Sequence, residues 1–344
     1  MTKLSIIIKA LNEERFIAGA IESALAAAAP FDGEVVLADS GSTDRTVAIA
    51  RPYPIRIVQL ARPAEASCGA GPQLGYQHSS GQYVYIMDGD MRLEPAFLRE
   101  AVMLLDRVQD VAGVGGLVED RQLDCLEYQR RAVRKDPHMQ PGEVDRLNGG
   151  GLYRRRAVEE AGYLGDQNLH SYEEFDLGAR LRARGWRLVR LDRLAIHHYG
   201  HTINAYRLLW RRLRTGYAAG VGEVVRAAVG QPHLCEVLRG LTELRLWAAV
   251  VAWWLSLATI VLVNGPWLWK LALFLAVAVL PFAVMTLARR SIGHALYAVV
   301  GWNVWTLGLL IGLSRWRRRS PRLWITSRVL RERQPMTLRT VEAA

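Results

Sequence analysis

Acidic and small polar residues follow three apolar runs in the first hundred residues of this 344-residue chain. The three segments are Lys9-Ala-Leu-Asn-Glu-Glu14, Asp39-Ser-Gly-Ser-Thr-Asp44 and Asp88-Gly-Asp90. In the last segment two acids flank one residue, and alternate residues of an extended chain project the same way. Two such carboxylates can bind one hard cation together with phosphate oxygens. Each segment alone could be a turn or a helix cap, but the three together indicate a binding site.

The runs before these segments predict the strands of a sheet. Apolar runs at 4–9, 34–39, 55–59 and 83–88 alternate with helical patterns, for example at 15–29 and 71–79. Strands that alternate with helices predict an α/β fold with a Rossmann-like, mainly parallel sheet covered on both faces. Ligands of such sheets bind at the carboxyl ends of the strands, where the three polar segments lie.

The order of these motifs over residues 3–202 resembles that of the family-2 inverting glycosyltransferases, which have the GT-A fold. In that family the acid corresponding to Asp39 holds the nucleotide base, although Ser40 replaces a second acid that usually follows. Asp88-Gly-Asp90 matches the family's DxD motif, which implies a Mn²⁺ or Mg²⁺ ion that offsets charge on the leaving nucleoside diphosphate. The residues expected to bind the nucleotide sugar are Ala10, Asn12, Glu13, Asp39, Gly71, Asp88, Gly89 and Asp90.

Motifs for the acceptor and for catalysis follow further along the chain. The run 148–151 (NGGG) resembles the family's glycine-rich segment, and 172–177 (YEEFDL) resembles its Glu-Asp motif at the start of a helix. The aligned catalytic base is Glu174, where the family usually has Asp; alternatively, Glu174 only stabilises the helix dipole. The resemblance implies His197 as a metal ligand beside Asp88 and Asp90. The residues expected to contact the acceptor or diphosphate are Gly150, Gly151, Glu173, His198 and Arg211.

The C-terminal part of the chain has a membrane-like composition. Charged residues almost vanish over 246–313, in which the apolar blocks 246–263, 267–287 and 292–313 approach the roughly 20 residues that cross a bilayer. Arginines crowd 207–214 and 315–319 on either side, interleaved with tyrosine and tryptophan. The net charge of +11 therefore indicates binding to an anionic membrane surface rather than to nucleic acid.

The positive-inside rule leaves the topology of these blocks open. If the catalytic domain is inside, three complete spans would place the arginines of 315–319 outside, against the rule. A re-entrant third block, or association with another subunit, would remove the conflict. We therefore predict a GT-A domain at 1–202, a basic amphipathic juxtamembrane segment at 203–245, two or three transmembrane helices within 246–313 and a basic tail at 314–344.

The expected protein is a multi-pass enzyme of the inner membrane with its catalytic domain in the cytoplasm. No signal peptide precedes the first strand pattern, and Cys68, Cys125 and Cys235 lack disulfide or zinc spacing. The expected reaction transfers one sugar from a nucleotide sugar, with UDP favoured, to a lipid-linked saccharide or polyprenyl phosphate in cell-surface polysaccharide or glycolipid synthesis. The processive family signature is absent from 207–212. The expected partners are the donor, the acceptor and membrane lipids. The sequence leaves open whether the chain also binds a second copy of itself.

Two other functions are compatible with parts of the sequence. The run 69–75 (GAGPQLG) superficially resembles a dinucleotide-binding fingerprint, but it follows AEAS rather than an apolar strand, which argues against an oxidoreductase. A non-catalytic membrane scaffold that retains the nucleotide-binding fold is the main alternative. The intact acids Asp88, Asp90 and Glu174 argue against a scaffold, and turnover of a donor would distinguish the two.

Overall fold

The computed structural model describes residues 2–121, 136–200 and 204–334. Cys125, the expected domain boundary at 202–203 and the last ten residues of the expected tail lie outside them. The strands are β1 (Leu4–Ala10), β2 (Glu34–Asp39), β3 (Arg56–Leu60), β4 (Tyr83–Asp88), β5 (Met91–Leu93), β6 (Val111–Asp120), β7 (Gly142–Glu143), β8 (Gly151–Arg154), β9 (Arg187–His198) and β10 (Ser327–Arg331).

The helices fall into those that cover the sheet and those that leave it. The first group is α1 (Ile17–Ala28), α2 (Thr46–Ala50), α3 (Ala70–Gln77), α4 (Pro95–Arg107), α6 (Arg155–Ala161) and α7 (Glu173–Arg182). The second group is α8 (Ala205–Arg214), η4 (Tyr217–Ala219), α9 (Gly220–Ala228), α10 (Leu234–Gly240), α11 (Leu244–Leu262), α12 (Trp267–Arg289) and α13 (Ile292–Ser314).

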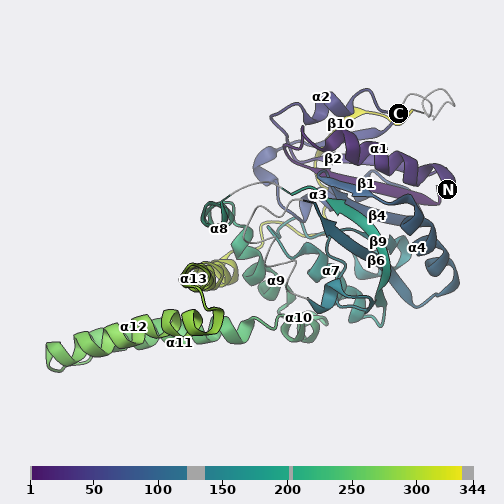
Figure 1. The fold of residues 1–344 in the computed structure, drawn as a ribbon. Helices are drawn as coiled ribbons and strands as arrows, with labels where there is room; N and C mark the ends of the chain where they lie inside the picture. The colour runs from purple at the N-terminus through teal and green to yellow at the C-terminus, as the bar shows by residue number, and fades with distance from the viewer. Residues whose placement is uncertain (1, 122–135, 201–203, 335–344) are drawn as a thin grey trace.

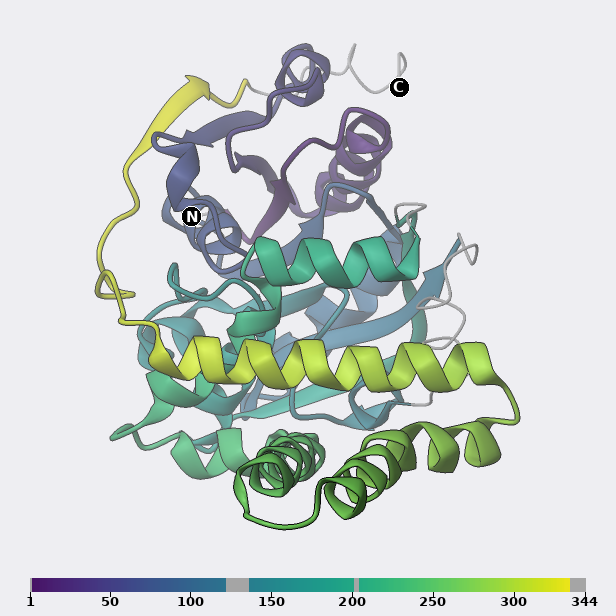
Figure 2. The same cartoon turned by 90° about the vertical axis from the view of Figure 1, so that its left-hand side faces the viewer.

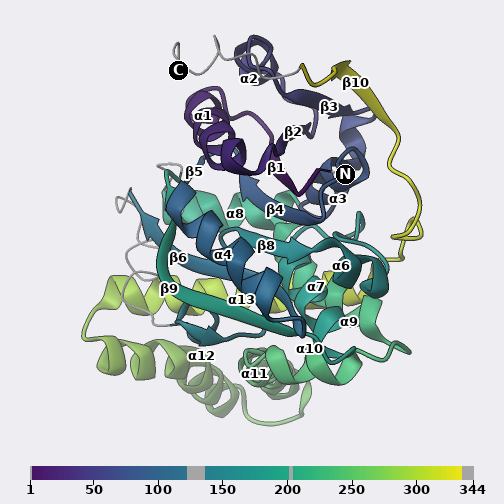
Figure 3. The ribbon, with the colours of Figure 1, turned by 90° about the vertical axis from the view of Figure 1, so that its right-hand side faces the viewer.

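The strands form one mixed sheet in the order β10-β3-β2-β1-β4-β8-β6-β9-β5, with β7 beside β9 (Figure 3). The four predicted strands, β1 to β4, are confirmed, and they are parallel to one another. Their carboxyl ends therefore meet at one edge, as the sequence predicts. Beyond β4 the sheet continues with β8, which is antiparallel to both β4 and β6, so the fold is α/β but less uniformly parallel than expected.

Alternate residues of the central strand β1 enter two separate cores. Ile6 and Ile8 pack with α1 and α4 on one face of the sheet, and Ile7 packs with α3 and α6 on the other. All three side chains are fully buried. A strand buried on both faces reads as a continuous apolar run, which explains the three consecutive isoleucines at 6–8. The two layers of helices fix the sheet edge that carries the polar loops.

The C-terminal segment returns to this sheet and was not expected there. Residues after α13 run along the domain, and β10 pairs antiparallel with the edge strand β3 (Figure 1). The predicted basic tail is thus partly a strand of the main sheet. In the sequence, the arginines of this tail resemble membrane anchors. The alternating pattern of a five-residue strand is also too short to distinguish from a charged tail.

Three helices are long and apolar enough to cross a membrane: α11, α12 and α13. They differ in how much of their apolar stretch is buried within the protein, at 11%, 0% and 39%, respectively. Figure 1 shows α11 and α12 extending away from the sheet, whereas α13 lies against the domain. At its contact with η4 and α9, a Cβ at Gly308 would lie 2.2 Å from the Ala218 carbonyl oxygen, so the two backbones meet directly.

Replacing Gly308 by alanine should therefore weaken the docking of α13. The added methyl group has no room, and overpacking of this kind costs about 1–3 kcal/mol. Thermal unfolding of the detergent-purified protein should show a lower Tm. Gly301→Ala is the matched control because a Cβ there meets nothing within 4 Å, and alanine favours the helix by up to about 1 kcal/mol. Equal Tm values for the two variants would contradict the packing described here.

Candidate active site

The loops after β1 and β2 are joined by side-chain hydrogen bonds. The Asn12 side-chain oxygen accepts from the backbone N–H of Thr43 at 2.8 Å, and the Asn12 N–H donates to Ser42 Oγ at 2.9 Å. The Glu13 N–H donates to Thr46 Oγ1 at 2.7 Å. Asn12 holds a positive φ of 60°, a conformation that asparagine tolerates better than most residues. Asn12 thus shapes the predicted nucleotide loop, and its side-chain oxygen is already occupied.

Asp39 is a buried acid, and only one of its two carboxylate oxygens has hydrogen-bond partners among the described residues. Its Oδ2 accepts hydrogen bonds from the N–H groups of Gly41 and Ser42, at 3.0 Å each, and from Gln59 Nε2 at 2.8 Å. Its Oδ1 is buried and has no hydrogen-bond partner among the described residues. A buried carboxylate oxygen without a donor is costly, so this atom is suited to accept a hydrogen bond from a ligand.

Lys9 contacts both the DxD motif, which is expected to bind the donor, and helix α7, which carries the predicted base. Its Nζ lies 3.1 Å from Asp88 Oδ1 on β4, and 3.0 and 3.6 Å from Glu173 Oε1 and Glu174 Oε1 on α7. Burial lowers the pKa of Lys9, but the three carboxylates outweigh burial and raise the pKa well above its usual value. Lys9 therefore remains an ammonium ion that binds three acids.

Lys9 belongs to the first polar segment of the sequence, but no role was predicted for it. One signal was available: a lysine at the end of an otherwise apolar strand, one strand away from the DxD acids. The parallel register pairs Lys9 with Asp88, which sets their side chains on the same face of the sheet. The contact with α7 could not be read from the sequence, because 164 residues separate Lys9 from Glu173.

Glu174 has the properties of a proton acceptor. Its side chain is 25% exposed, and Glu173 beside it is 8% exposed. Burial raises the pKa of Glu174 to about 7, repulsion from Glu173 adds to the shift, and Lys9 opposes it. A carboxyl group with a pKa near neutrality can accept a proton and release it again near pH 7.

The structure places His198, rather than His197, beside Asp90. His198 Nε2 lies 3.4 Å from Asp90 Oδ2, and its Nδ1 lies 2.7 Å from Asp120 Oδ1. Burial lowers the pKa of His198, but its hydrogen bonds to Asp120 and Asp90 outweigh burial and raise the pKa to about 9. His197 instead contacts Glu94 and Glu119, at 2.9 and 2.7 Å. Successive residues of a strand face opposite sides, so only one of the two histidines can face Asp90.

The expected glycines lie around this edge. A Cβ at Gly89 would lie 2.9 Å from Glu13 Cγ and 3.3 Å from the Ala10 Cβ, so the DxD turn packs on the first loop. Gly71 lies beside Lys9, since a Cβ added at Gly71 would lie 3.3 Å from the Lys9 Cβ. Gly150 adopts a φ of 95° at the entry to β8, and Gly151 pairs with Ile86 of β4.

The predicted acceptor residue Arg211 lies on the exposed face of α8. Its neighbour Arg212 faces inward instead, with its guanidinium carbon 5.1 Å from the centre of the Tyr217 ring and 5.8 Å from that of Trp305. Tyr217 is close enough to Glu173 and Glu174 for both acids to contribute to its raised pKa, after the effect of burial. Arg212, which was not singled out from the sequence, is therefore the arginine that packs on Tyr217.

The donor atoms suit a hard divalent cation, but they do not form a complete protein site. Among the described residues, no group of three or more His, Cys, Asp or Glu side chains is arranged to hold a metal. Asp88 is 40% exposed and contacts Lys9, and Asp90 is largely buried beside His198, so these two carboxylates are the candidates to contact a cation. Mg²⁺ commonly binds through one or two carboxylates with substrate phosphates and water. The residues therefore fit a cation that arrives with a diphosphate.

Lys9→Met should destabilise the protein strongly at neutral pH. Removing the ammonium group leaves three partly buried carboxylates unpaired, at a cost of about 3 kcal/mol or more. Because the pKa of Glu174 is raised to about 7, protonation removes one of these charges below neutrality, and the loss of Tm should be largest above pH 7 and should shrink towards pH 5. Lys3→Met is the control: Lys3 pairs with Asp106 on the surface, at 2.8 Å, and such a pair contributes less than about 1 kcal/mol. Similar Tm losses in both variants would refute the central role of Lys9.

Comparisons with known proteins agree with the predicted resemblance. Residues 5–162 match the model of glycosyl transferase family 2. The chain is 33% identical over 142 residues to the dodecaprenyl-phosphate galacturonate synthase of Rhizobium johnstonii, which covers 39% of this chain and 37% of that protein. It is 29% identical over 197 residues to the putative glycosyltransferase EpsE of Bacillus subtilis. This match covers 54% of this chain and 68% of that protein. The chain thus spans little more than a third of the Rhizobium protein.

A solved structure shares the fold over most of the chain. The mannosyltransferase from Pyrobaculum calidifontis, in complex with GDP-Man and Mn²⁺, superposes with a TM-score of 0.58 at 17% identity. The match covers 89% of this chain and 87% of that one. At this identity the likeness establishes the fold alone. Residues 5–162 therefore match glycosyl transferase family 2, and the chain has a GT-A-like α/β fold.

Proposed function

We propose that this protein is a membrane-anchored inverting glycosyltransferase that moves a single sugar from a nucleotide sugar to a membrane-bound acceptor. The observation that carries the proposal is the contact of Lys9 with both Asp88 of the DxD motif and Glu174. One ammonium group thereby brings the acid that would serve the donor close to the acid that would serve the acceptor. A transfer reaction needs both at the same carbon atom.

The donor would lie across the ends of β1, β2 and β4. Asp39 Oδ1, which has no partner in the described part of the chain, is placed to accept the N–H of a nucleotide base. Asp88 and Asp90 would hold a Mn²⁺ or Mg²⁺ ion, with His198 rather than His197 adjoining Asp90. The bound cation would stabilise negative charge on the diphosphate. The resemblance to family 2 favours UDP as the nucleotide.

Glu174 would act as the general base. It would take the proton of an acceptor hydroxyl while that oxygen bonds to the anomeric carbon of the sugar. The bond from this carbon to the diphosphate oxygen would break on the opposite face, so the configuration inverts. Lys9 would keep Glu174 in place and partly compensate the charge of Glu173, 3.0 Å away. The base must lie within hydrogen-bond reach of the hydroxyl it deprotonates.

A lipid-linked acceptor agrees with the surroundings of the site. The Rhizobium relative is named as a synthase of a dodecaprenyl-phosphate sugar. In this chain, three apolar helices follow the domain, and the basic helix α8 packs on Tyr217 through Arg212. Arginines near a membrane surface attract anionic headgroups. We therefore favour a polyprenyl phosphate or lipid-linked saccharide as acceptor, with the catalytic domain on the cytoplasmic side of the inner membrane.

Glu174→Gln should abolish transfer while sparing donor binding. Gln cannot accept the proton, and loss of a general base lowers kcat by about 10²–10⁴. The measurement is nucleoside diphosphate release from UDP- and GDP-sugars with a polyprenyl phosphate acceptor. Calorimetry with Mn²⁺ should give an unchanged Kd for the donor, and Asp90→Asn should weaken it.

Glu159→Gln is the matched control for this experiment. Glu159 is exposed on α6, so the same chemical change there should leave kcat unaltered. Normal turnover by Glu174→Gln would reject the assignment of the base. Donor binding without turnover in the wild-type protein, across all donors and acceptors, would favour the scaffold instead.

The activity should rise with pH through neutrality. A base acts when deprotonated, and the pKa of Glu174 is raised to about 7. Below that value kcat/KM should fall about tenfold per pH unit, and above it the rate should level off. The profile is measured between pH 5 and 9 under conditions in which the Tm of the protein stays constant. A flat profile down to pH 5 would contradict the raised pKa.

A further inference from the structure

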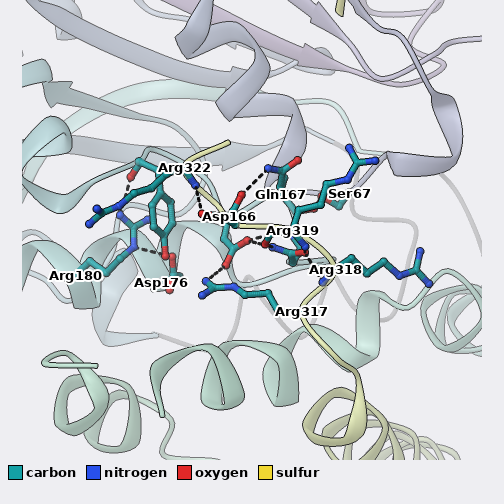
Figure 4. A network of polar contacts seen from close by, with 12 residues as sticks. Ser67, Asp166, Gln167, Asp176, Arg180, Arg317, Arg318, Arg319 and Arg322 are labelled. Carbon is teal, nitrogen blue, oxygen red and sulfur yellow. Dashed lines mark hydrogen bonds and ion pairs between the residues drawn. The ribbon is translucent and has the colours of Figure 1, made fainter. Parts of the chain in front are cut away.

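The chain leaves the catalytic domain for α11 and comes back to the same domain after α13. The returning segment is bound in two ways. Residues of β10 pair with β3 in the sheet, and three alternate arginines before it contact acids of the domain. Figure 4 shows the middle of this row, where Arg317 reaches Asp166 beside Gln167 and Arg319.

The three arginines form ion pairs with buried or half-buried acids. Arg315 lies 2.9 Å from Glu223, Arg317 lies 2.5 Å from Asp166, and Arg319 lies 2.5 Å from Glu65. Asp166 and Glu223 are 0% and 1% exposed. An unpaired carboxylate at such a position is costly, so the arginines are needed where they are. Their charges therefore belong to the fold and lie on the membrane side that holds the catalytic domain.

A segment that starts and ends on one side of a membrane crosses it an even number of times. Three apolar helices lie between α10 and Arg315, so they cannot all cross. The strongest candidates to cross are α11 and α12, whose apolar stretches are 11% and 0% buried in the protein. They are joined at Asn264-Gly-Pro266, a turn with no charged residue.

The third helix, α13, is tied along its length to the catalytic domain. Near its start, the ring of Tyr297 packs against Tyr206 of α8, with 5.4 Å between centroids. Near its end, Gly308 and Gly312 lie against the backbones of Ala218 and Ala219. A domain that carries the Glu223–His170 pair at this contact cannot enter the hydrocarbon with the helix.

The orientation of the helices agrees with this restriction. Figure 1 shows α11 and α12 lengthwise as they leave the domain, and it shows α8 and α13 end-on. Figure 2 shows α13 lengthwise across the same side of the domain. If α11 and α12 cross the bilayer, α8 and α13 lie along its surface.

The outward face of these two helices suits the boundary between headgroups and hydrocarbon. Leu296, Leu307, Leu310 and Leu313 of α13 are 40–44% exposed, although the opposite face of the helix is buried against the domain. On α8, Trp210 is 60% exposed, and Arg207, Arg211 and Arg214 are on the surface. Apolar side chains beside arginine and tryptophan are typical of helices that lie in the membrane interface.

We infer that α11 and α12 cross the membrane as a hairpin, and that α13 lies in the membrane surface beside α8 without crossing. The inference does not depend on the proposed transferase activity. It removes the conflict with the positive-inside rule, because Arg315 to Arg319 then remain with the catalytic domain. Trp305 of α13 contacts Tyr217, at 6.3 Å between ring centroids, so this surface adjoins the region of Glu173 and Glu174.

Cysteine labelling tests the two positions that distinguish the topologies. Gly265→Cys marks the turn between α11 and α12, where an added Cβ meets nothing within 4 Å. Trp316→Cys marks the end of α13, where the side chain is 92% exposed. The full chain is treated in right-side-out spheroplasts with a membrane-impermeant maleimide, before and after permeabilisation, and labelled peptides are identified by mass spectrometry. Native Cys235, exposed on α10, reports the side of the catalytic domain.

The expected result is that Trp316→Cys is labelled together with Cys235, and that Gly265→Cys is labelled from the opposite side. Labelling of Trp316→Cys together with Gly265→Cys would show that α13 crosses and would overturn the inference. Labelling of all three cysteines from one side would overturn it as well, because no helix would then cross. Fluorescent protein fused to either end of the unaltered chain gives a second readout: the two fusions should report the same side.

Discussion

The site depends on one ammonium group that is held among three carboxylates. Asp88, Glu173 and Glu174 would repel one another at these distances, and burial makes each negative charge more costly. Lys9 compensates them from the end of the central strand, whose position is fixed by the cores on both faces of the sheet. The precision of the site therefore comes from the most rigid part of the fold, while the loops around it supply the hydrogen-bonding groups.

This arrangement also explains how one small volume can hold acids with different tasks. The pKa of Glu174 is raised to about 7 by burial and by Glu173, whereas Asp39 is surrounded by donors on one of its oxygens. Lys9 limits the rise at Glu174 without abolishing it. Environment, rather than residue type, separates a group suited to proton transfer from one suited to ligand binding.

Much of the fold could be predicted because its signals are local. Continuous apolar runs identified β1 to β4, and the polar segments after them identified the sheet edge. Contacts between distant segments could not be predicted, such as Lys9 with Glu173 or β10 with β3. The choice between His197 and His198 also required the strand register, since a shift of one residue reverses the face. Arg315 to Arg319 look like membrane anchors in sequence, and only the fold reveals the acids they bind.

The position of β10 has a consequence for the biogenesis of the protein. The edge strand β3 receives its partner only after the membrane helices have been synthesised, because β10 follows them in the chain. Until then β3 presents unpaired N–H and C=O groups, which are a template for pairing with other chains. Insertion of the helices into the membrane and completion of the sheet are therefore linked. A soluble fragment cut before α11 would retain an uncovered edge and would tend to aggregate.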